Sequence, residues 1–472
     1  MRRVIVISDL HIGGAEHPML GHPEHLVDFL EQLAAYVPAQ GEEVELVING
    51  DFVDFLAEKP YAGFTASESE VVEKLTAIRS RLPEVFSKLA FCANRLSRFT
   101  ILLGNHDVEL AFPRVRESLL RALGTEPHRC LFVCNNETYR VGELLIEHGN
   151  RYDPWNAIDY DGLRELVSCA SRGEVPPKPL SICPGSRLVE EVMNPLKERY
   201  HFVDLLKPED KIVTLMLLAF EPQLLQDLHK LFKGAQLYVK QHFRKAIWRA
   251  SGDAPRPGQR RFVARSDEED VLPPDVEDAF AEELEVARAN AARQPVGLFE
   301  TLRRAFLEDE TESLKAILEK GDDIGTHRIR QLQVALAKKM QNDKTFVDDD
   351  KDSEASRPYV DAARQMVDAG VAKVVVMGHT HLRRHIRLEN GGRYLNTGTW
   401  ADLIVVDDRL LEENAKSRVD FIDWIRCLAT NRLEGIRDCD PTYADVRLTD
   451  AGLVIDDARP MLRRHRRGDS FA

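Results

Sequence analysis

Several short apolar runs in this chain end in side chains that carry metal-binding or proton-transfer chemistry. The clearest run is Phe99–Leu103, which is followed at once by Gly104-Asn105-His106-Asp107. A short β-rich run that stops at glycine and polar residues is typical of a buried strand leading into an active-site loop. The same pattern occurs five times, and this repetition constrains both the fold and the chemistry.

The candidate ligands follow their strands in a regular way. Open α/β sheets place ligands at the carboxyl ends of their strands, so the five loops meet at one rim if the strands share a sheet. The strands and the residues behind them are Val4–Ile7 with Asp9 and His11, Val44–Ile48 with Asp51, Phe99–Leu103 with Asn105 and His106, Leu144–Ile146 with His148, and Val374–Met377 with His379 and His381.

This donor set predicts bound metal. It combines oxygen and imidazole donors without a thiolate, which suits Mn²⁺, Zn²⁺ or Fe better than Mg²⁺ or Ca²⁺. Seven of these residues, all except His106, are the predicted ligands, which exceed the need of one ion but suit two ions that share a bridging carboxylate. Such ions lie about 3.5–4 Å apart and stabilise the attacking and leaving oxygens of a phosphoryl displacement. We therefore expect two divalent ions, with Mn²⁺ as the first choice.

The chain divides by pattern into four segments. Strands and helices alternate over residues 1–156, where the pattern Ser67–Leu96 predicts a long helix that Pro83 kinks or splits. Helical patterns dominate residues 157–358, and strand patterns return over residues 359–460. The helices expected in the middle segment are Leu188–Tyr200, Ile212–Phe232, Asp275–Asn290, Leu298–Lys320 and His327–Lys339. The helical segment reads as an insertion into, or a cap over, the α/β part. Residues 461–472 form a basic tail, which is either a solvated, disordered end or a binding patch.

Composition narrows the classes of partner. The chain has 472 residues, enough for two or three domains, and its formal net charge of −14 disfavours a surface that grips nucleic acid. Its amino-terminal residues predict a first strand and no signal peptide, and no apolar run is long enough to span a membrane. The seven scattered cysteines indicate free thiols in a reducing cytoplasm.

The order of the fragments resembles the calcineurin-like metallophosphoesterases. Their pattern is Asp-x-His, Gly-Asp, Gly-Asn-His-Asp, His and Gly-His-x-His, and it is complete here over roughly residues 1–156 and 370–460. The resemblance implies an α/β fold, a four-layer α/β/β/α sandwich of two mixed sheets, with a large, mainly helical insertion. The matching fragments are Asp9-Leu10-His11, Gly50-Asp51, Gly104-Asn105-His106-Asp107, His148-Gly149 and Gly378-His379-Thr380-His381.

The same resemblance implies roles for these residues in the hydrolysis of phosphomonoesters or phosphodiesters. His106 would contact the phosphate and assist the leaving oxygen, Asp107 would orient that imidazole, and a bridging hydroxide would be the nucleophile. One metal would be held by Asp9, His11 and His381, the other by Asn105, His148 and His379, and Asp51 would bridge them.

The segment after His148 is the candidate substrate contact. Arg151 can form a bidentate pair with phosphate, Tyr152 can stack on a base or sugar, and Asn150 stands beside them. The alternative is that this segment only packs the start of the insertion. The substrate would be a phosphorylated small molecule, a nucleotide or a lipid-linked phosphate. Within the family, Ser8-Asp9-Leu10-His11 and Gly398-Thr399-Trp400 distantly resemble the bacterial UDP-2,3-diacylglucosamine hydrolases, which typically carry Asp where this chain has Asn150.

Other functions remain open at this stage. One is a scaffold that binds a partner through its helical region and carries a vestigial phosphoesterase domain, and another is a nuclease acting on DNA. Asp54 is either a helix-start residue or a support for the metal ligands. His17, His22 and His25 lack ligand spacing and predict a solvated loop. The oligomeric state is not predicted.

Overall fold

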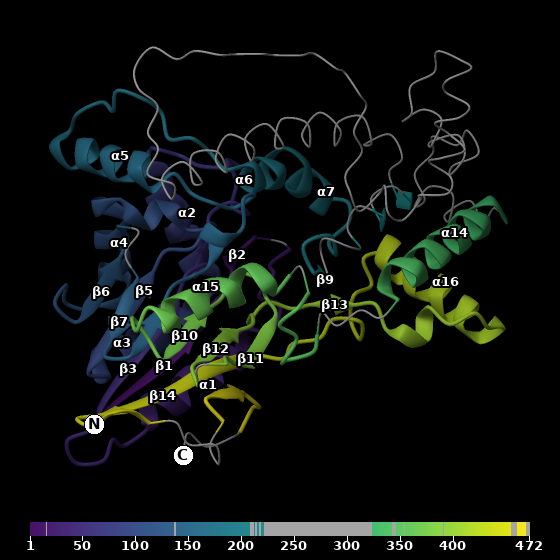
Figure 1. The fold of residues 1–472 in the computed structure, drawn as a ribbon. Coiled ribbons are helices and arrows are strands. Elements are labelled where there is room, and N and C mark those ends of the chain that lie inside the picture. Colours follow the sequence, from purple (N-terminus) through teal and green to yellow (C-terminus); the bar gives the residue numbers. More distant parts are fainter. Residues whose placement is uncertain are drawn as a thin grey trace, which may run out of the picture. The chain divides into compact units, whose positions relative to one another are not determined.

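The computed structural model describes residues 1–207 and 323–468, together with residues 212, 215, 216, 219 and 220. Positions 16, 136–137, 342–345, 354, 390 and 455–459 lie outside the description. The chain forms two compact units (Figure 1). The first consists of Met1–Pro195, Lys344–Asp402 and Asp438–Ala472, and the second of Leu196–Asp343 and Leu403–Arg437.

The larger sheet of the first unit has seven strands in the order β15-β14-β1-β3-β5-β6, with β16 also paired to β14. β1, β3, β5 and β6 run parallel, whereas β14 runs antiparallel to β1, β15 and β16. The strands are β1 (Arg2–Ile7), β3 (Glu43–Asn49), β5 (Arg98–Leu102), β6 (Cys130–Val133), β14 (Thr442–Thr449), β15 (Gly452–Val454) and β16 (Leu462–Arg464).

The smaller sheet has five strands in the order β11-β12-β10-β8-β7. The three central strands are parallel, and the two outer ones pair antiparallel to their neighbours. These strands are β7 (Tyr139–Val141), β8 (Leu144–Ile146), β10 (Val374–Met377), β11 (Arg383–Arg387) and β12 (Arg393–Thr397). Both large sheets are therefore mixed, as predicted. A separate two-stranded pair joins β2 (Ile12–Gly13) to β4 (Val53–Asp54).

Alternating side chains divide the hydrophobic interior into layers. Val4 and Val6 on β1 pack in a cluster with Val374 and Val376 of the smaller sheet, so this cluster lies between the sheets. Ile5 and Ile7 point to the opposite face, where the larger sheet is covered by helices. Because both faces are buried there, β1 and β10 read as nearly continuous apolar runs.

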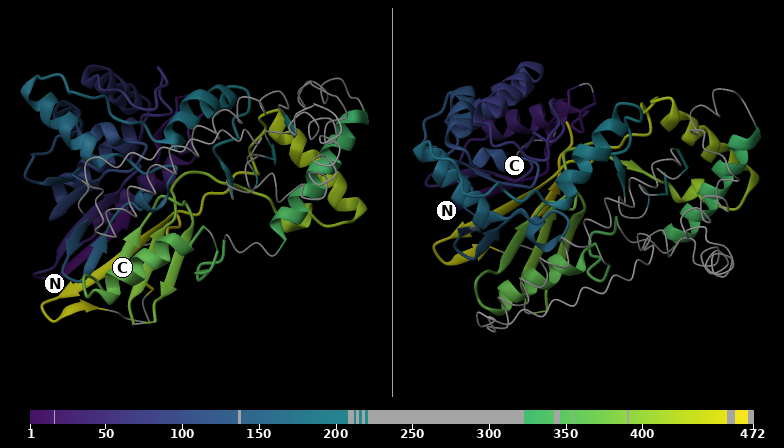
Figure 2. Two further views of the ribbon diagram at one scale, coloured as in Figure 1. Left: turned by 45° about the horizontal axis from the view of Figure 1, so that its top comes forward. Right: turned by 90° about the horizontal axis from the view of Figure 1, so that it is seen from above.

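Helices cover the outer face of each sheet. The larger sheet packs against apolar faces of the four helices α1 (Pro23–Ala35), α2 (Glu68–Arg81), α3 (Pro83–Arg95) and α4 (Pro113–Leu123). The smaller sheet packs against α15 (Arg357–Asp368), through Tyr359, Val360 and Ala363. Figures 1 and 2 show α15 lying along β10 and β12. This confirms the predicted α/β/β/α order of layers.

The helix boundaries mostly follow the sequence patterns. The long pattern Ser67–Leu96 is split at Pro83, as predicted, because proline lacks the amide hydrogen that a continuing helix requires. The pattern Leu188–Tyr200 instead gives α6 (Pro184–Leu188), a π-helical turn (Val189–Met193) and α7 (Asn194–Lys197). Helix α5 (Tyr160–Arg172) was not predicted, and it belongs to the first unit.

The second unit contains α14 (Asp323–Met340), α16 (Ala415–Ala429) and the short pair β9 (Leu206–Lys207) with β13 (Ile404–Val405). The predicted helix His327–Lys339 corresponds to α14, whereas α16 was not predicted. The predicted helices Asp275–Asn290 and Leu298–Lys320 lie outside the described residues, as does most of Ile212–Phe232.

The carboxyl-terminal tail differs from expectation. Leu462–Arg464 forms β16 and pairs with β14, so the segment that begins at residue 461 is not a solvated end throughout. His465 is also buried, at 5% exposure, and its ring stacks near Trp400. The predicted domain boundaries at residues 156, 358 and 460 stay a prediction.

Candidate metal centre

The predicted ligands lie at the carboxyl ends of strands from both large sheets. Asp9 and His11 follow β1, Asp51 follows β3, and Asn105 follows β5, all in the larger sheet. His148 follows β8, and His379 and His381 follow β10, both in the smaller sheet. The condition that all five strands share one sheet was therefore wrong. Instead, each sheet contributes parallel strands, and the loops after these strands meet at a common edge of the sandwich.

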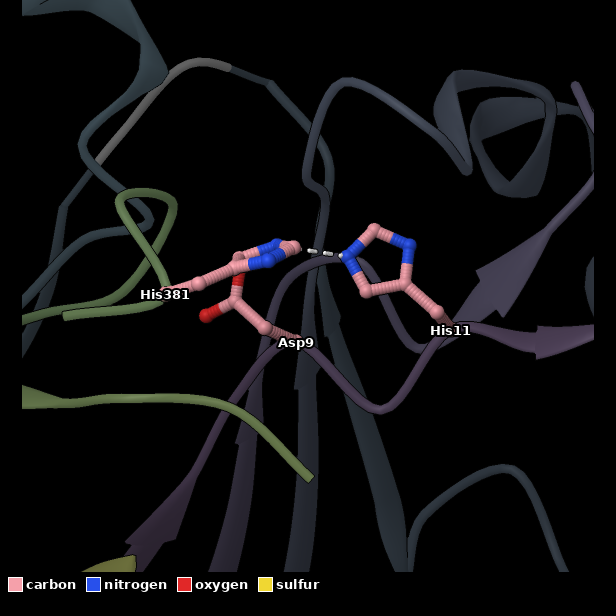
Figure 3. A group of neighbouring side chains, drawn as sticks. All are labelled: Asp9, His11 and His381. Atoms are coloured by element: carbon pink, nitrogen blue, oxygen red, sulfur yellow. Dashed lines mark hydrogen bonds and ion pairs between the residues drawn. The ribbon is translucent and has the colours of Figure 1, made fainter. Parts of the chain in front are cut away.

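One group of ligands consists of Asp9, His11 and His381 (Figure 3). Their ligand atoms all lie within 4.8 Å of one another. The Nε2 atoms of His11 and His381 are 2.9 Å apart, and His381 Nε2 is 3.5 Å from a carboxylate oxygen of Asp9. All three residues are buried. Two imidazole nitrogens this close to one carboxylate form a ready set of donors for one cation.

A second group consists of Asp51, His148 and His379. The Nε2 atom of His148 lies 3.2 Å from Oδ2 of Asp51. The same oxygen lies 3.8 Å from Nε2 of His11, which belongs to the first group. Asp51 is thus the carboxylate that connects the two groups, in the position where the sequence predicted a bridging ligand.

The backbone at these ligands is strained. Among the described residues, seven non-glycine residues have positive φ, and five of them are predicted ligands: Asp9, His11, Asp51, His379 and His381, with φ between 44° and 70°. Left-handed backbone is uncommon for residues with a Cβ and persists where the surrounding structure enforces it. Its concentration at the ends of three strands marks this edge as a functional site.

Two glycines allow the loops to approach closely. A Cβ on Gly104 would collide with the carboxylate of Asp51, and a Cβ on Gly378 would collide with Ser8 and the carboxylate of Asp9. These positions therefore require glycine because a ligand carboxylate occupies the space of the missing side chain. The glycines of Gly-Asn-His-Asp and Gly-His-Thr-His are in this way part of the site.

Neighbouring groups fix the orientation of three ligand imidazoles. His148 Nδ1 lies 2.8 Å from the carbonyl oxygen of Asn49, so it must donate and leave Nε2 toward Asp51. His11 Nδ1 lies 3.2 Å from Asp54, and His379 Nε2 lies 3.1 Å from Asp153. Metal-binding histidines commonly have such a partner at the other ring nitrogen, because it selects the tautomer and the ring position.

The electrostatics of the site favour a cation. Burial lowers the pKa of His148, but the carboxylates of Asp51 and Asp9 outweigh it and raise that pKa to about 9. Burial raises the pKa of Asp51, but the imidazoles of His148 and His106 more than offset this and hold it well below its usual range. The negative charge that stabilises a proton on His148 would equally stabilise a metal ion.

His106 is oriented by a residue other than the predicted one. Its Nδ1 lies 3.1 Å from Asp54, whereas both oxygens of Asp107 accept backbone hydrogen bonds, from Phe52 and Gly104, each at 2.7 Å. The predicted orienting role of Asp107 is therefore a role of Asp54, and Asp107 joins two loops. Burial lowers the pKa of His106, but Asp54 and Asp51 outweigh it and raise that pKa to about 10.

Asn105 provides a test of whether the residues fit a metal ion. Its side chain is buried, and its Oδ1 atom has no hydrogen-bond partner. Its neighbours in the loop both reach Asp51, since the His106 amide donates to Asp51 Oδ1 at 2.9 Å and Gly104 packs against that carboxylate. An unsatisfied buried amide oxygen is costly unless something binds it. A divalent cation beside Asp51 would satisfy it.

The three candidate substrate residues make internal contacts. The Tyr152 hydroxyl donates to Glu147 at 2.5 Å, and the Asn150 amide donates to the carbonyl of Asn156 at 3.0 Å. Arg151 lies 3.4 Å from Glu147, with 37% of its side chain exposed. Tyr152 also packs with the cluster under α15, so stacking on a substrate would require it to leave that cluster. Their role in substrate binding stays a prediction.

Sequence reasoning missed Asp153 and left Asp54 undecided. Asp153 follows the ligand His148 by five positions, and no spacing rule connects it to His379, which is 226 residues away. Asp54 contacts the rings of both His11, a predicted ligand, and His106, the predicted proton donor. Its position three residues after Asp51 was the available signal.

Comparison with known proteins agrees with the geometry. Residues 2–189 match the family model of the calcineurin-like phosphoesterases. Over these residues the match agrees with the predicted resemblance, and phosphoester hydrolysis with divalent metal is the general chemistry that it suggests. No curated protein matches the chain. The finer resemblance to UDP-2,3-diacylglucosamine hydrolases therefore stays a prediction.

Proposed function

We propose that this chain, which carries a calcineurin-like phosphoesterase domain in residues 2–189, hydrolyses phosphoester bonds with two divalent metal ions. The observation that carries the proposal is the pair of ligand groups joined by Asp51. Asp9, His11 and His381 would hold one ion, and Asn105, His148 and His379 the other. Asp51 would contact both.

The donor chemistry points to the class of metal. Imidazole nitrogens with carboxylate and amide oxygens suit Mn²⁺, Zn²⁺ or Fe, and we propose Mn²⁺ as the first choice. When bound, two such ions supply a water of lowered pKa as the nucleophile and neutralise charge on the phosphoryl group. The strained loops and the orienting partners hold the ligand atoms in place before any ion binds.

His106 would act on the leaving group. In the metal-free protein, Asp54 and Asp51 raise the pKa of His106 to about 10, so the imidazole carries a proton there. A positioned imidazole of this kind can give a proton to the departing oxygen. Asp54 holds Nδ1, so Nε2 is the atom left to face the substrate. About 17% of the His106 side chain is exposed, whereas the His11 side chain is 1% exposed, which agrees with a residue at the open side of the site.

Several kinds of substrate fit the proposed reaction. We propose a phosphorylated small molecule, a nucleotide or a lipid-linked phosphate, as a monoester or a diester, with Arg151 as the candidate phosphate contact. The formal net charge of −14 disfavours DNA as substrate.

Among the helices of the described residues, none is long and apolar enough to cross a bilayer. We also propose that the protein is cytoplasmic and that residues 157–358 form a cap over the phosphoesterase part.

The test uses p-nitrophenyl phosphate and bis-p-nitrophenyl phosphate with added Mn²⁺, together with the metal content per chain. We expect turnover of at least one ester and two ions per chain. His106→Ala should retain both ions and lose about 10²–10⁴-fold in kcat, the usual contribution of a positioned acid. Turnover of neither ester, with fewer than two ions per chain, would leave the scaffold hypothesis. Normal turnover by His106→Ala would show that its proposed role is wrong.

A further inference from the structure

A separate group of potential metal ligands shares no residue with this centre and lies at the amino-terminal end of α1. His22 directly precedes α1, Asp402 lies in the loop that follows β12 in sequence, and Cys439 lies shortly before β14. One ligand atom from each residue lies within 4.8 Å of the other two. The predicted solvated loop at His22 is therefore wrong, since His22 Nδ1 lies 2.8 Å from Asp402 Oδ1. All three residues belong to the first unit.

We propose that His22, Asp402 and Cys439 form a third metal site, independent of the candidate centre, for a transition-metal ion of the zinc class. Thiolate and imidazole donors select Zn²⁺ and similar ions, whereas Mg²⁺ and Ca²⁺ prefer oxygen shells. Three protein ligands leave a fourth position of a tetrahedral ion open to water.

Charge and burial both support a cation at this place. Asp402 is fully buried, and the His22 side chain with which it forms an ion pair is 40% exposed. Burial, together with the carboxylates of Asp402, Asp438, Glu24 and Asp440, raises the pKa of the Cys439 thiol to about 12. The thiol therefore keeps its proton in the metal-free protein, and a bound ion would displace that proton while the same carboxylates stabilise the cation. The positive end of the α1 dipole opposes a cation, and Glu24 in the first turn offsets it.

The proposed site would join parts of the chain that are far apart in sequence. His22 and Asp402 are separated by 380 positions, and Cys439 enters from a third segment. The loop that ends at Asp402 also reaches the candidate centre, because the amide of Trp400 and the hydroxyl of Thr399 donate to the carbonyl of Asp9, at 3.1 and 2.8 Å. An ion at this site would therefore stabilise the loop that holds Asp9.

The cysteine ligand gives a test that the candidate centre cannot imitate. None of the seven predicted ligands of that centre is a thiolate, so a thiolate-to-cobalt absorption band in the near ultraviolet cannot come from it. We expect this band when the full-length protein is titrated with Co²⁺, and we expect Zn²⁺ to remove it by displacement. Cys439→Ser should abolish the band. Cys427→Ser is the matched control, since Cys427 is also free and partly buried, and it should keep the band.

Two further variants separate this proposal from folding defects and from the proposed function. His22→Ala changes a side chain that is 40% exposed and should weaken Co²⁺ binding, measured by the band, without unfolding the protein. Asp51→Ala should remove metal from the candidate centre and leave the band intact. A protein that shows no band with Co²⁺ in excess, or a band that survives Cys439→Ser, would overturn the proposal. The group would then be an ion pair of His22 with Asp402 beside a cysteine.

Discussion

The two ligand groups of the candidate centre differ in what holds them in place. In the first group, His11 is held by the side chain of Asp54, which also holds His106. In the second group, His148 is held by the backbone carbonyl of Asn49, and His379 by Asp153 in the segment after β8. The two groups share Asp51.

Because of this difference, substitutions of the supporting residues should affect the chemical step and metal binding to different extents. Because Asp54 supports both a ligand and the proposed proton donor, a change at Asp54 should reach the leaving-group step. Of the two groups, Asp153 contacts the second, through His379, so a change there should act on one ion. A substitution at Asp51 should affect both ions and the chemical step together, since both groups share this carboxylate. Four substitutions test this order.

Asp51→Ala should have the largest effect. Both groups lose their common carboxylate, so we expect fewer than two bound ions and a fall in kcat of about 10³-fold or more, the equivalent of several kcal/mol of transition-state stabilisation. Metal analysis and steady-state kinetics measure the two effects. Retention of two ions by this variant would contradict the bridging role and the comparison built on it.

Gly104→Ala should reproduce much of that loss without removing a ligand. The added Cβ would occupy the space of the Asp51 carboxylate, so the bridging oxygen must move. Gly124→Ala is the matched control, because Gly124 has positive φ but open space around it. The control should cost about 1 kcal/mol in unfolding free energy and leave metal content unchanged. Equal metal content in both variants would show that Asp51 tolerates displacement.

Much of this comparison could be predicted from the sequence, because local signals carry it. Runs such as Val4–Ile7 and Phe99–Leu103 are buried on both faces and therefore read as strands, and the ligand residues stand directly behind them. The split at Pro83 follows from the missing amide hydrogen. The assignment of ligands to two sheets came only through the resemblance, since periodicity does not tell which strands pair.

The supporting contacts could not be predicted for a different reason. Asp153 meets His379 only because β8 pairs with β10, and this long-range pairing leaves no local pattern. Positive φ at Asp9 and His381 is also invisible in the sequence, where such backbone is expected at glycine. The two-residue strands β2 and β4 and the terminal strand β16 are too short for a periodic signal.

Asp54→Asn should change the chemical step more than metal binding. It removes the first of the carboxylates that raise the pKa of His106, so that pKa should fall from about 10. Titration of the His106 ring by NMR in the metal-free protein measures this fall, and kcat should drop by about 10²-fold or more. Asp107→Asn is the comparison, because Asp107 has the smaller effect on His106. A larger pKa change in Asp107→Asn would restore the role first predicted for that residue.

Asp153→Ala should have the smallest effect and the most selective one. The His379 ring loses its partner at Nε2, and loss of such a support commonly weakens metal binding by about 10–100-fold. Only the ion of the second group should be affected, so a Mn²⁺ titration should change from two tight sites to one tight and one weaker site. Asp153→Asn should recover part of the affinity, because its amide oxygen can still accept from the imidazole. Asp161→Ala, at an exposed position of α5 paired with Arg164, should bind Mn²⁺ like the wild type. Equal weakening of both ions by Asp153→Ala would show that the two groups are supported as one unit.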